Sequence, residues 1–124
     1  MVSHEFKPLV SPHFKLEEVA CRCGCGYWVI NDVLVWKLEA LRARIDHKPL
    51  VVHSWCRCEE HNRRVGGVPG SLHIYGMAAD VSSPGVSLAE LARQADGLFD
   101  GVGVYWRQGF VHVDIRGWRS RWQE

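Results

Sequence analysis

The chain has 124 residues, of which 47% are hydrophobic, so it can bury one core but not two, and we expect a single domain over residues 1–124. Its formal net charge of +1 excludes the strongly basic surface that nucleic-acid-binding proteins use. No run approaches the roughly 18 apolar residues of a membrane helix, and the first ten residues lack the apolar stretch of a signal peptide. We therefore expect a chain made in the cytoplasm, with neither nucleic acid nor membrane as a partner.

The first half of the chain predicts three helices. Ser11 and Pro12 have the character of a helix cap and a first-turn proline, which predicts a short helix directly after them. Asn31 is the expected cap of a long helix over residues 32–45, and residues 59–65 predict a short polar helix. The apolar positions of the long helix recur every three or four residues and are Val35, Leu38, Leu41 and Ile45.

Strand patterns appear from residue 50 onwards. Residues 50–52 form a short β-branched run, which predicts a strand. Ser87 and Glu90 have the spacing of a capping box and open one more predicted helix. Residues 101–106 and 110–117 then predict two strands joined by a tight turn. The expected class is α+β, with a small antiparallel sheet that carries helices packed on one face.

The cysteines form two clusters, CRCGC and CRC, rather than the C-x-x-C spacing of zinc ribbons and redox dithiols. There are five of them, namely Cys21, Cys23, Cys25, Cys56 and Cys58. An odd count without a signal peptide favours reduced thiols, whereas two clusters that meet in space could form a disulfide or a thiolate metal site. The sequence leaves all three interpretations open.

The last predicted strand has two chemically different faces, because alternate residues of a strand share a face. One face carries Val111, Val113 and Ile115, and the other carries Phe110, His112, Asp114 and Arg116. Three ionisable residues in succession on one face fit the floor of a site. A solvated face with an incidental ion pair would give the same pattern.

A second polar segment is expected to meet this strand. Residues 71–80 predict a loop that runs into a strand, in which Asp80 lies on the face opposite Ala79. If His73, Asp80 and His112 converge, they form a three-ligand set with one open position, as in catalytic zinc sites, on the sheet face away from the helices. Such a zinc ion would activate a water molecule and polarise a carbonyl. The alternative is three unrelated polar residues, and the H-E-x-x-H signature is absent.

Two motifs in this order and separation resemble a known family. The first is S-x-H-x-x-G-x-A-x-D, matched by Ser71, His73, Gly76, Ala78 and Asp80, and the second is F-V-H-V-D-I-R at residues 110–116. They resemble the zinc D-Ala-D-Ala carboxypeptidase family, in the larger group that includes lysostaphin-type peptidases and the hedgehog domain. The similarity covers nearly the whole chain and is closest to the short single-domain members of bacteria and phages.

The resemblance implies roles for individual residues. His73, Asp80 and His112 fall on the family's zinc ligands, Arg57 falls on the arginine that holds the substrate carboxylate or the oxyanion, and Ser71 would contact the substrate. Family members carry an acidic residue three positions before the last ligand, where this chain has Gly109. Asp114 is our candidate for the general base, and its alternative role is to orient a ligand without proton transfer.

The expected function is zinc-dependent hydrolysis of a peptide bond in bacterial peptidoglycan, as a D-Ala-D-Ala carboxypeptidase or an endolysin-type cross-link peptidase. The partner would be the peptidoglycan stem peptide, the chain would be a monomer, and its site of action would be the cell wall, with phage-mediated release as one route. The alternatives are a non-catalytic, zinc-stabilised module that binds wall peptides or a protein, and a metal-free structural protein of a phage particle.

Aromatic residues flank both motifs and could line a substrate groove or pack in the core. The candidates are Trp55, Tyr75, Tyr105 and Trp106. Trp118 and Trp122, near the end of the chain, are expected to pack over the edge of the sheet.

Overall fold

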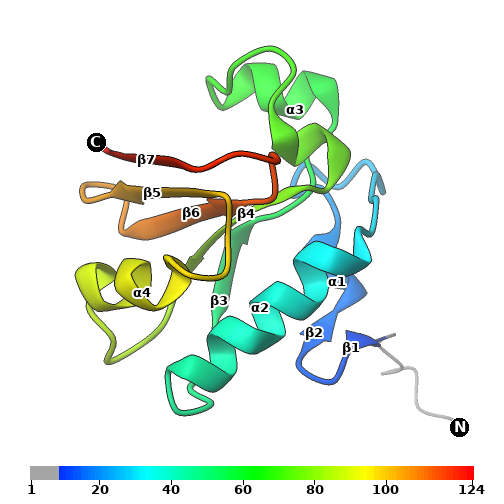
Figure 1. Cartoon of the computed structure of the whole chain (residues 1–124). Coiled ribbons are helices and arrows are strands. Elements are labelled where there is room, and N and C mark those ends of the chain that lie inside the picture. The colour runs from blue at the N-terminus through cyan, green and yellow to red at the C-terminus, as the bar shows by residue number, and fades with distance from the viewer. Residues whose placement is uncertain (1–8) are drawn as a thin grey trace, which may run out of the picture.

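The computed structural model describes residues 9–124, which form a five-stranded sheet with helices on both sides of it (Figure 1). The strands, in their order across the sheet, are β3 (Val51–Ser54), β4 (Ala78–Ser82), β6 (Phe110–Asp114), β5 (Gly101–Tyr105) and β7 (Ser120–Gln123). Neighbouring strands are antiparallel except for β5 and β7, which are parallel. The α+β class is therefore confirmed, but the sheet is mixed.

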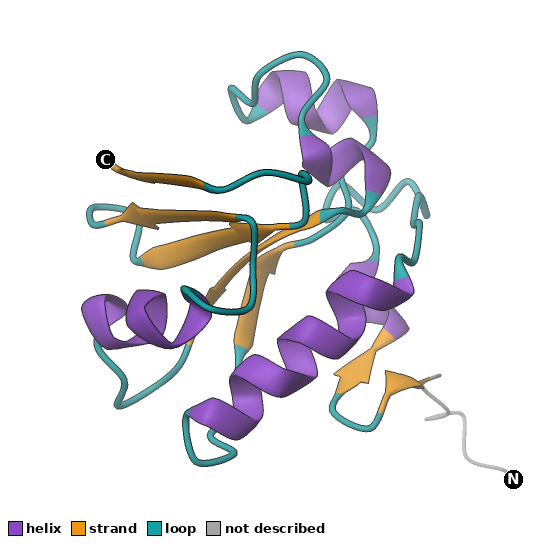
Figure 2. Ribbon diagram, in the orientation of Figure 1, coloured by secondary structure: helices purple, strands orange, loops and turns teal. Residues whose placement is uncertain are grey.

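The remaining elements precede or connect these strands. They are the hairpin of β1 (Leu9–Ser11) and β2 (Phe14–Lys15), the helices α1 (Leu16–Val19), α2 (Asp32–Arg44), α3 (Glu59–Arg64) and α4 (Leu88–Ala95), and the 3₁₀ turn η1 (Leu72–Tyr75). Figure 2 shows α2 and α4 on one side of the strands and α3 on the other. Within the described residues, no helix is both long and apolar enough to span a membrane.

The hydrophobic core lies between the sheet and the helices α2 and α4. The sheet contributes Val52, Ala79, Val81, Val102, Val111 and Val113, and the helices contribute Leu34, Val35, Leu38, Leu41, Leu91 and Ala95. Each of these valine and leucine side chains stabilises the fold by roughly 1.5–3 kcal/mol through its burial. The predicted apolar stripe of the long helix is confirmed.

The caps of α2 and α4 follow from side-chain chemistry. The Asn31 side chain accepts hydrogen bonds from the backbone N–H groups of Val33 and Leu34, as its position before the helix predicts. Ser87 caps α4 by accepting from the N–H of Glu90. The Glu90 carboxylate does not complete a capping box, because it binds Arg93 and Gln94 instead.

The prediction that the first helix begins directly after Ser11 and Pro12 is wrong. Pro12 lies in the turn of the β1–β2 hairpin, and α1 begins only at Leu16. The Ser11 hydroxyl donates to Glu39 of α2 instead of capping a helix, and the start of α1 is held by the Glu18 carboxylate, which accepts from the backbone of Lys15. A long-range contact thus overrides the local signal.

The last strand was also not predicted, and it makes the sheet mixed. The segment expected to pack over the sheet edge pairs with β5 in parallel, with Gly103 and Trp122 opposite each other. Gly103 is required there, because a Cβ atom at this position would lie 2.3 Å from the Trp122 indole ring. The chain end therefore extends the sheet beside the strand that precedes His112.

Candidate metal centre and active site

Three side chains converge on the sheet face opposite the core. His73 comes from η1, and Asp80 of β4 is the direct cross-strand neighbour of His112 on β6. Asp80 Oδ1 lies 2.9 Å from His112 Nδ1 and 3.3 Å from His73 Nε2. Tetrahedral zinc at about 2.0–2.1 Å from N and O ligands implies ligand separations of roughly 3.3 Å, so this spacing fits the ion.

The other nitrogen of each histidine ring is already occupied. His73 Nδ1 lies 2.7 Å from the carbonyl oxygen of Trp55, and His112 Nε2 lies 2.8 Å from Asp114 Oδ2. In neutral rings these nitrogens carry the proton, so His73 Nε2 and His112 Nδ1 can direct lone pairs toward the Asp80 oxygen. In that form the three atoms need a metal cation among them, whereas without a metal a proton on a ring nitrogen takes its place as a hydrogen bond. The donor set therefore fits zinc, and both partners are of the kind that orient metal-binding histidines.

The local sequence explains how η1 delivers His73. The Ser71 hydroxyl accepts a hydrogen bond from the His73 N–H and caps the turn. Gly76 ends it in the left-handed conformation with φ of 69°, and a Cβ there would lie 2.5 Å from the Val29 carbonyl oxygen. The motif thus specifies a backbone turn as well as ligands.

Hydrogen bonding keeps the buried carboxylate of Asp80 charged. Burial alone would raise its pKa, but hydrogen bonds with His112 and His73 hold the pKa of Asp80 well below its usual range. Burial lowers the pKa of His112, but its hydrogen bonds with Asp114 and Asp80 outweigh burial and raise it above its ordinary value. An ionised, nearly buried carboxylate flanked by two imidazole nitrogens is a donor set that suits a divalent cation.

Arg57 is fixed beside the metal centre by three hydrogen bonds. Its Nε, Nη1 and Nη2 atoms bind Ser54, Asn62 and Asp80 at 3.1, 3.1 and 3.3 Å. A guanidinium has five N–H donors, so two remain for a ligand in the cleft. Gly67 makes room for this arrangement, because a Cβ there would lie 2.1 Å from the Asn62 amide oxygen.

Asp114 lies behind His112 rather than in the open cleft. Its side chain is fully buried, and it accepts from Arg116 through both oxygens in addition to its contact with His112. Burial raises the pKa of Asp114, but the hydrogen bonds with His112 and Arg116 hold it well below the usual range. Gly101 accommodates the carboxylate, since a Cβ there would lie 2.3 Å from it.

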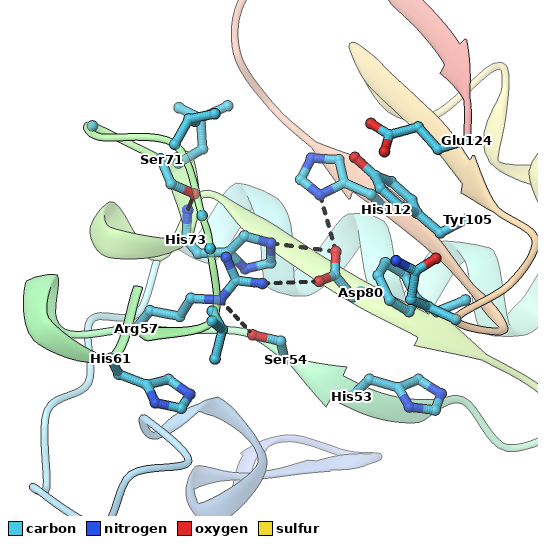
Figure 3. A pocket seen from close by; sticks show the side chains of 18 of the residues that line it. His53, Ser54, Arg57, His61, Ser71, His73, Asp80, Tyr105, His112 and Glu124 are labelled. Carbon is cyan, nitrogen blue, oxygen red and sulfur yellow. Dashed lines mark hydrogen bonds and ion pairs between the residues drawn. The ribbon is translucent and has the colours of Figure 1, made fainter. Parts of the chain in front are cut away.

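The metal centre lies in a cleft of about 940 Å³ (Figure 3). The carboxylates that line this cleft are Asp80 and Glu124, and Figure 3 shows Glu124 beside Tyr105 and His112. Of the four aromatic residues expected to flank a groove, only Tyr105 lines the cleft, together with Trp118 and Trp122 from the chain end. Trp55 is buried in the core.

Comparison with known proteins agrees with this geometry. The model of the family described as peptidase M15 matches residues 12–114. The chain belongs to the peptidase M15 family. It is also 38% identical over 63 residues to the zinc D-Ala-D-Ala carboxypeptidase of Streptomyces albus G, a match that covers 51% of this chain and 25% of that relative.

The family assignment confirms what the two motifs predicted, and zinc is the metal that fits the M15 donor set of this chain. The matched region contains Arg57, His73, Asp80 and His112, but β7 and Glu124 lie beyond it. The sequence predicted neither the strand β7 nor the position of Glu124 in the cleft. The reason is that the parallel pairing of β7 with β5 leaves no local sequence pattern. Gly109, at the position where family members carry an acid, takes φ of 82° in the β5–β6 turn.

Proposed function

We propose that this M15 chain is a zinc-dependent peptidase that hydrolyses a peptide bond in the stem peptide of bacterial peptidoglycan, and that it acts at the cell wall. The observation that carries the proposal is the convergence of His73, Asp80 and His112 in a cleft that also contains Arg57. The substrate class is supported by the Streptomyces relative, which is a zinc D-Ala-D-Ala carboxypeptidase. The chain spans only a quarter of the length of that relative.

Each polar residue of the cleft has a proposed task. Zinc held by the three donors would lower the pKa of water and polarise the scissile carbonyl. Arg57 binds the substrate carboxylate or the developing oxyanion through its two remaining N–H donors, as its planar, permanently charged group suits. The Ser71 hydroxyl, which lines the cleft, contacts the bound peptide.

We assign proton transfer to Glu124 and the orientation of His112 to Asp114. Both Asp114 oxygens are engaged by His112 and Arg116, which suits the orienting role. Glu124 is the other carboxylate besides Asp80 that lines the cleft, and Figure 3 shows it beside His112, which supports the proposal that it accepts the proton of the attacking water and returns it to the leaving amine. Glu124 would replace the acidic side chain that is missing at position 109, where this chain has glycine.

The decisive experiment compares two stem peptides that end in D-Ala-D-Ala, one with a free carboxylate and one with a carboxamide. If Arg57 holds the terminal carboxylate, the zinc-loaded chain releases D-alanine from the acid and cleaves the amide roughly 10-fold more slowly. Equal rates on both peptides, with cleavage of cross-linked dimers, would instead indicate an endolysin-type peptidase. The Arg57→Lys variant should lose the preference for the acid, because an ammonium cannot form the paired contact.

A second candidate function is a zinc-stabilised module that binds wall peptides without turnover. It is favoured by Gly109, which leaves the family's acidic position without a carboxylate. This function predicts that the zinc-loaded chain binds the same peptides but releases no product. That result would exclude the peptidase proposal.

A further inference from the structure

A second cluster of potential metal ligands lies outside the cleft. Four cysteines, Cys21, Cys23, Cys25 and Cys58, have sulfur atoms that all lie within 4.8 Å of one another. Three belong to the loop between α1 and α2, and the fourth caps α3, so two segments far apart in the sequence meet there (Figure 1). The peptidase chemistry proposed above uses none of these residues.

The sulfur separations match a tetrahedral metal site. Cys21 Sγ lies 3.4 Å from Cys23 Sγ and 3.9 Å from Cys58 Sγ, and the last two atoms are 3.7 Å apart. Zinc–sulfur bonds of about 2.3 Å in a tetrahedron place the sulfurs roughly 3.8 Å from one another. A disulfide requires about 2.05 Å between one pair of sulfurs, and no two of the described cysteines are bonded.

The loop backbone is shaped to direct its three sulfurs to one point. Gly24 and Gly26 follow Cys23 and Cys25 and take φ of 85° and 87°, so each reverses the chain where a side chain would be strained. The N–H of Cys21 donates to the carbonyl of Tyr27 at 2.8 Å and closes the loop. The CRCGCG sequence therefore supplies both the ligands and the turns between them.

Backbone donors also surround the sulfurs. The N–H groups of Cys58, His61 and Tyr27 point to Cys21, Cys58 and Cys25 at 3.4, 3.3 and 3.4 Å. Such bonds stabilise negative charge on sulfur, and thiolate is the form that binds metal. The fifth cysteine differs, because Cys56 is buried and exchanges hydrogen bonds with the backbone of Val29.

We propose that Cys21, Cys23, Cys25 and Cys58 bind a second zinc ion as a closed, structural four-thiolate site. Each thiol gives up its proton as its Zn–S bond forms, so binding releases up to four protons to solvent, and no oxidant is needed. Because Cys58 directly follows Arg57, this ion would tie the arginine segment to the N-terminal loop. The bound ion would thus hold Arg57 in place beside the cleft without taking part in the hydrolysis.

The test is metal binding by the reduced, full-length chain, and its failure is distinguishable from failure of the peptidase proposal. Cobalt(II) added to metal-free protein should give thiolate-to-metal charge-transfer absorption in the wild type and in His112→Ala, which lacks only the cleft site. The Cys23→Ser/Cys25→Ser variant should lose this absorption, and both of its side chains are exposed, so the core is untouched. Cys56→Ser is the matched control, because serine can keep the bonds to Val29.

Zinc content should give the same answer by an independent route. We expect about two equivalents in the wild type and in Cys56→Ser, and about one in the double variant and in His112→Ala. Circular dichroism of the double variant checks that it folds. The proposal is overturned if reduced wild-type protein shows no thiolate absorption with cobalt, if the double variant keeps the wild-type zinc content, or if mass spectrometry finds a disulfide within this cluster.

Discussion

Asp114 is a buried carboxylate that lies behind His112, one of the three candidate metal ligands, rather than in the open cleft. It fixes the His112 ring through Nε2 and is itself held by Arg116. We predict that Asp114→Asn, which keeps the shape but removes the charge, weakens zinc binding by roughly 10–100-fold. Competition with a chromogenic chelator measures this. Unchanged zinc affinity with a collapsed hydrolytic rate would show instead that Asp114 is the general base.

For Glu124 we predict the opposite pattern, a loss of hydrolytic rate without a loss of zinc binding. Glu124→Gln should lower the hydrolytic rate by roughly 10²–10⁴-fold, because the amide cannot take the proton, while zinc content stays unchanged. Steady-state kinetics on a stem peptide measures the loss. Glu60→Gln, which alters an exposed carboxylate paired with Arg64, is the matched control and should have no effect. Full activity in Glu124→Gln would remove Glu124 from this role.

These residues also show where sequence reasoning stops. Strand alternation and motif spacing placed Asp80 and His112 on one face, because both signals are local and regular. The ring orientations could not be predicted, since His73 is held by the backbone carbonyl of Trp55, which is 18 positions away. No role was predicted for Asn62, which supports Arg57, because the sequence of its segment predicts only a short polar helix.

At the scale of elements, the N-terminal hairpin is joined to α2 by Glu39. The Glu39 carboxylate accepts from the Ser11 hydroxyl at 2.6 Å and from the His13 backbone at 2.9 Å, and its Oε1 lies 2.6 Å from His13 Nδ1. Burial raises the pKa of Glu39, but these bonds outweigh burial and lower it. The ionised form is therefore the one that stabilises the fold.

The lowered pKa determines the sign of the pH effect. A carboxylate whose pKa falls on folding stabilises the native state above its unfolded pKa of about 4.3, and loses that contribution as pH falls through the folded value. We predict that Glu39→Gln lowers the free energy of unfolding by about 1–2 kcal/mol at pH 7 and by much less at about pH 3. Urea unfolding at both pH values measures this, and a pH-independent difference would contradict it.

The elements that sequence predicted best are those with a regular period and a local cap. The long helix has both, so its position was expected. The turn between β5 and β6 was expected at Gln108 and Gly109 between two strand patterns, and Gly109 does take a positive φ there. The hairpin at Ser11 and the parallel strand β7 depend on partners distant in sequence. Their local signals therefore favoured a helix and a packed tail instead.

At the scale of the whole molecule, the core residues and the candidate metal ligands of the sheet lie on opposite faces of it. One face packs against α2 and α4 and forms the core, and strand alternation leaves the paired residues Asp80 and His112 on the other face. A change at the metal centre can therefore alter zinc binding without opening the core. This separation is why the ligand variants proposed above are expected to stay folded.

The same separation predicts how zinc alters global stability. The three candidate ligands of the cleft come from η1, β4 and β6, so the unfolded chain cannot present them together, and zinc bound there should bind chiefly the folded state. Ligand at about 100 times its dissociation constant then stabilises the fold by roughly 2.7 kcal/mol. We predict that the free energy of unfolding rises with buffered free zinc, measured by urea unfolding at several zinc concentrations.

His112→Ala tests which site produces this dependence. In His112→Ala, the loss of one of the three candidate cleft ligands should remove the part of the zinc dependence that belongs to the cleft, and any part due to the cysteine cluster should remain. In Cys23→Ser/Cys25→Ser, the part due to the cysteine cluster should disappear instead. Two separable increments are expected because the two ligand sets share no residue. If the wild-type free energy of unfolding were the same at every zinc concentration, neither set would bind zinc in the folded state. If both variants lost the whole dependence, the two sites would form one coupled unit rather than two independent ones.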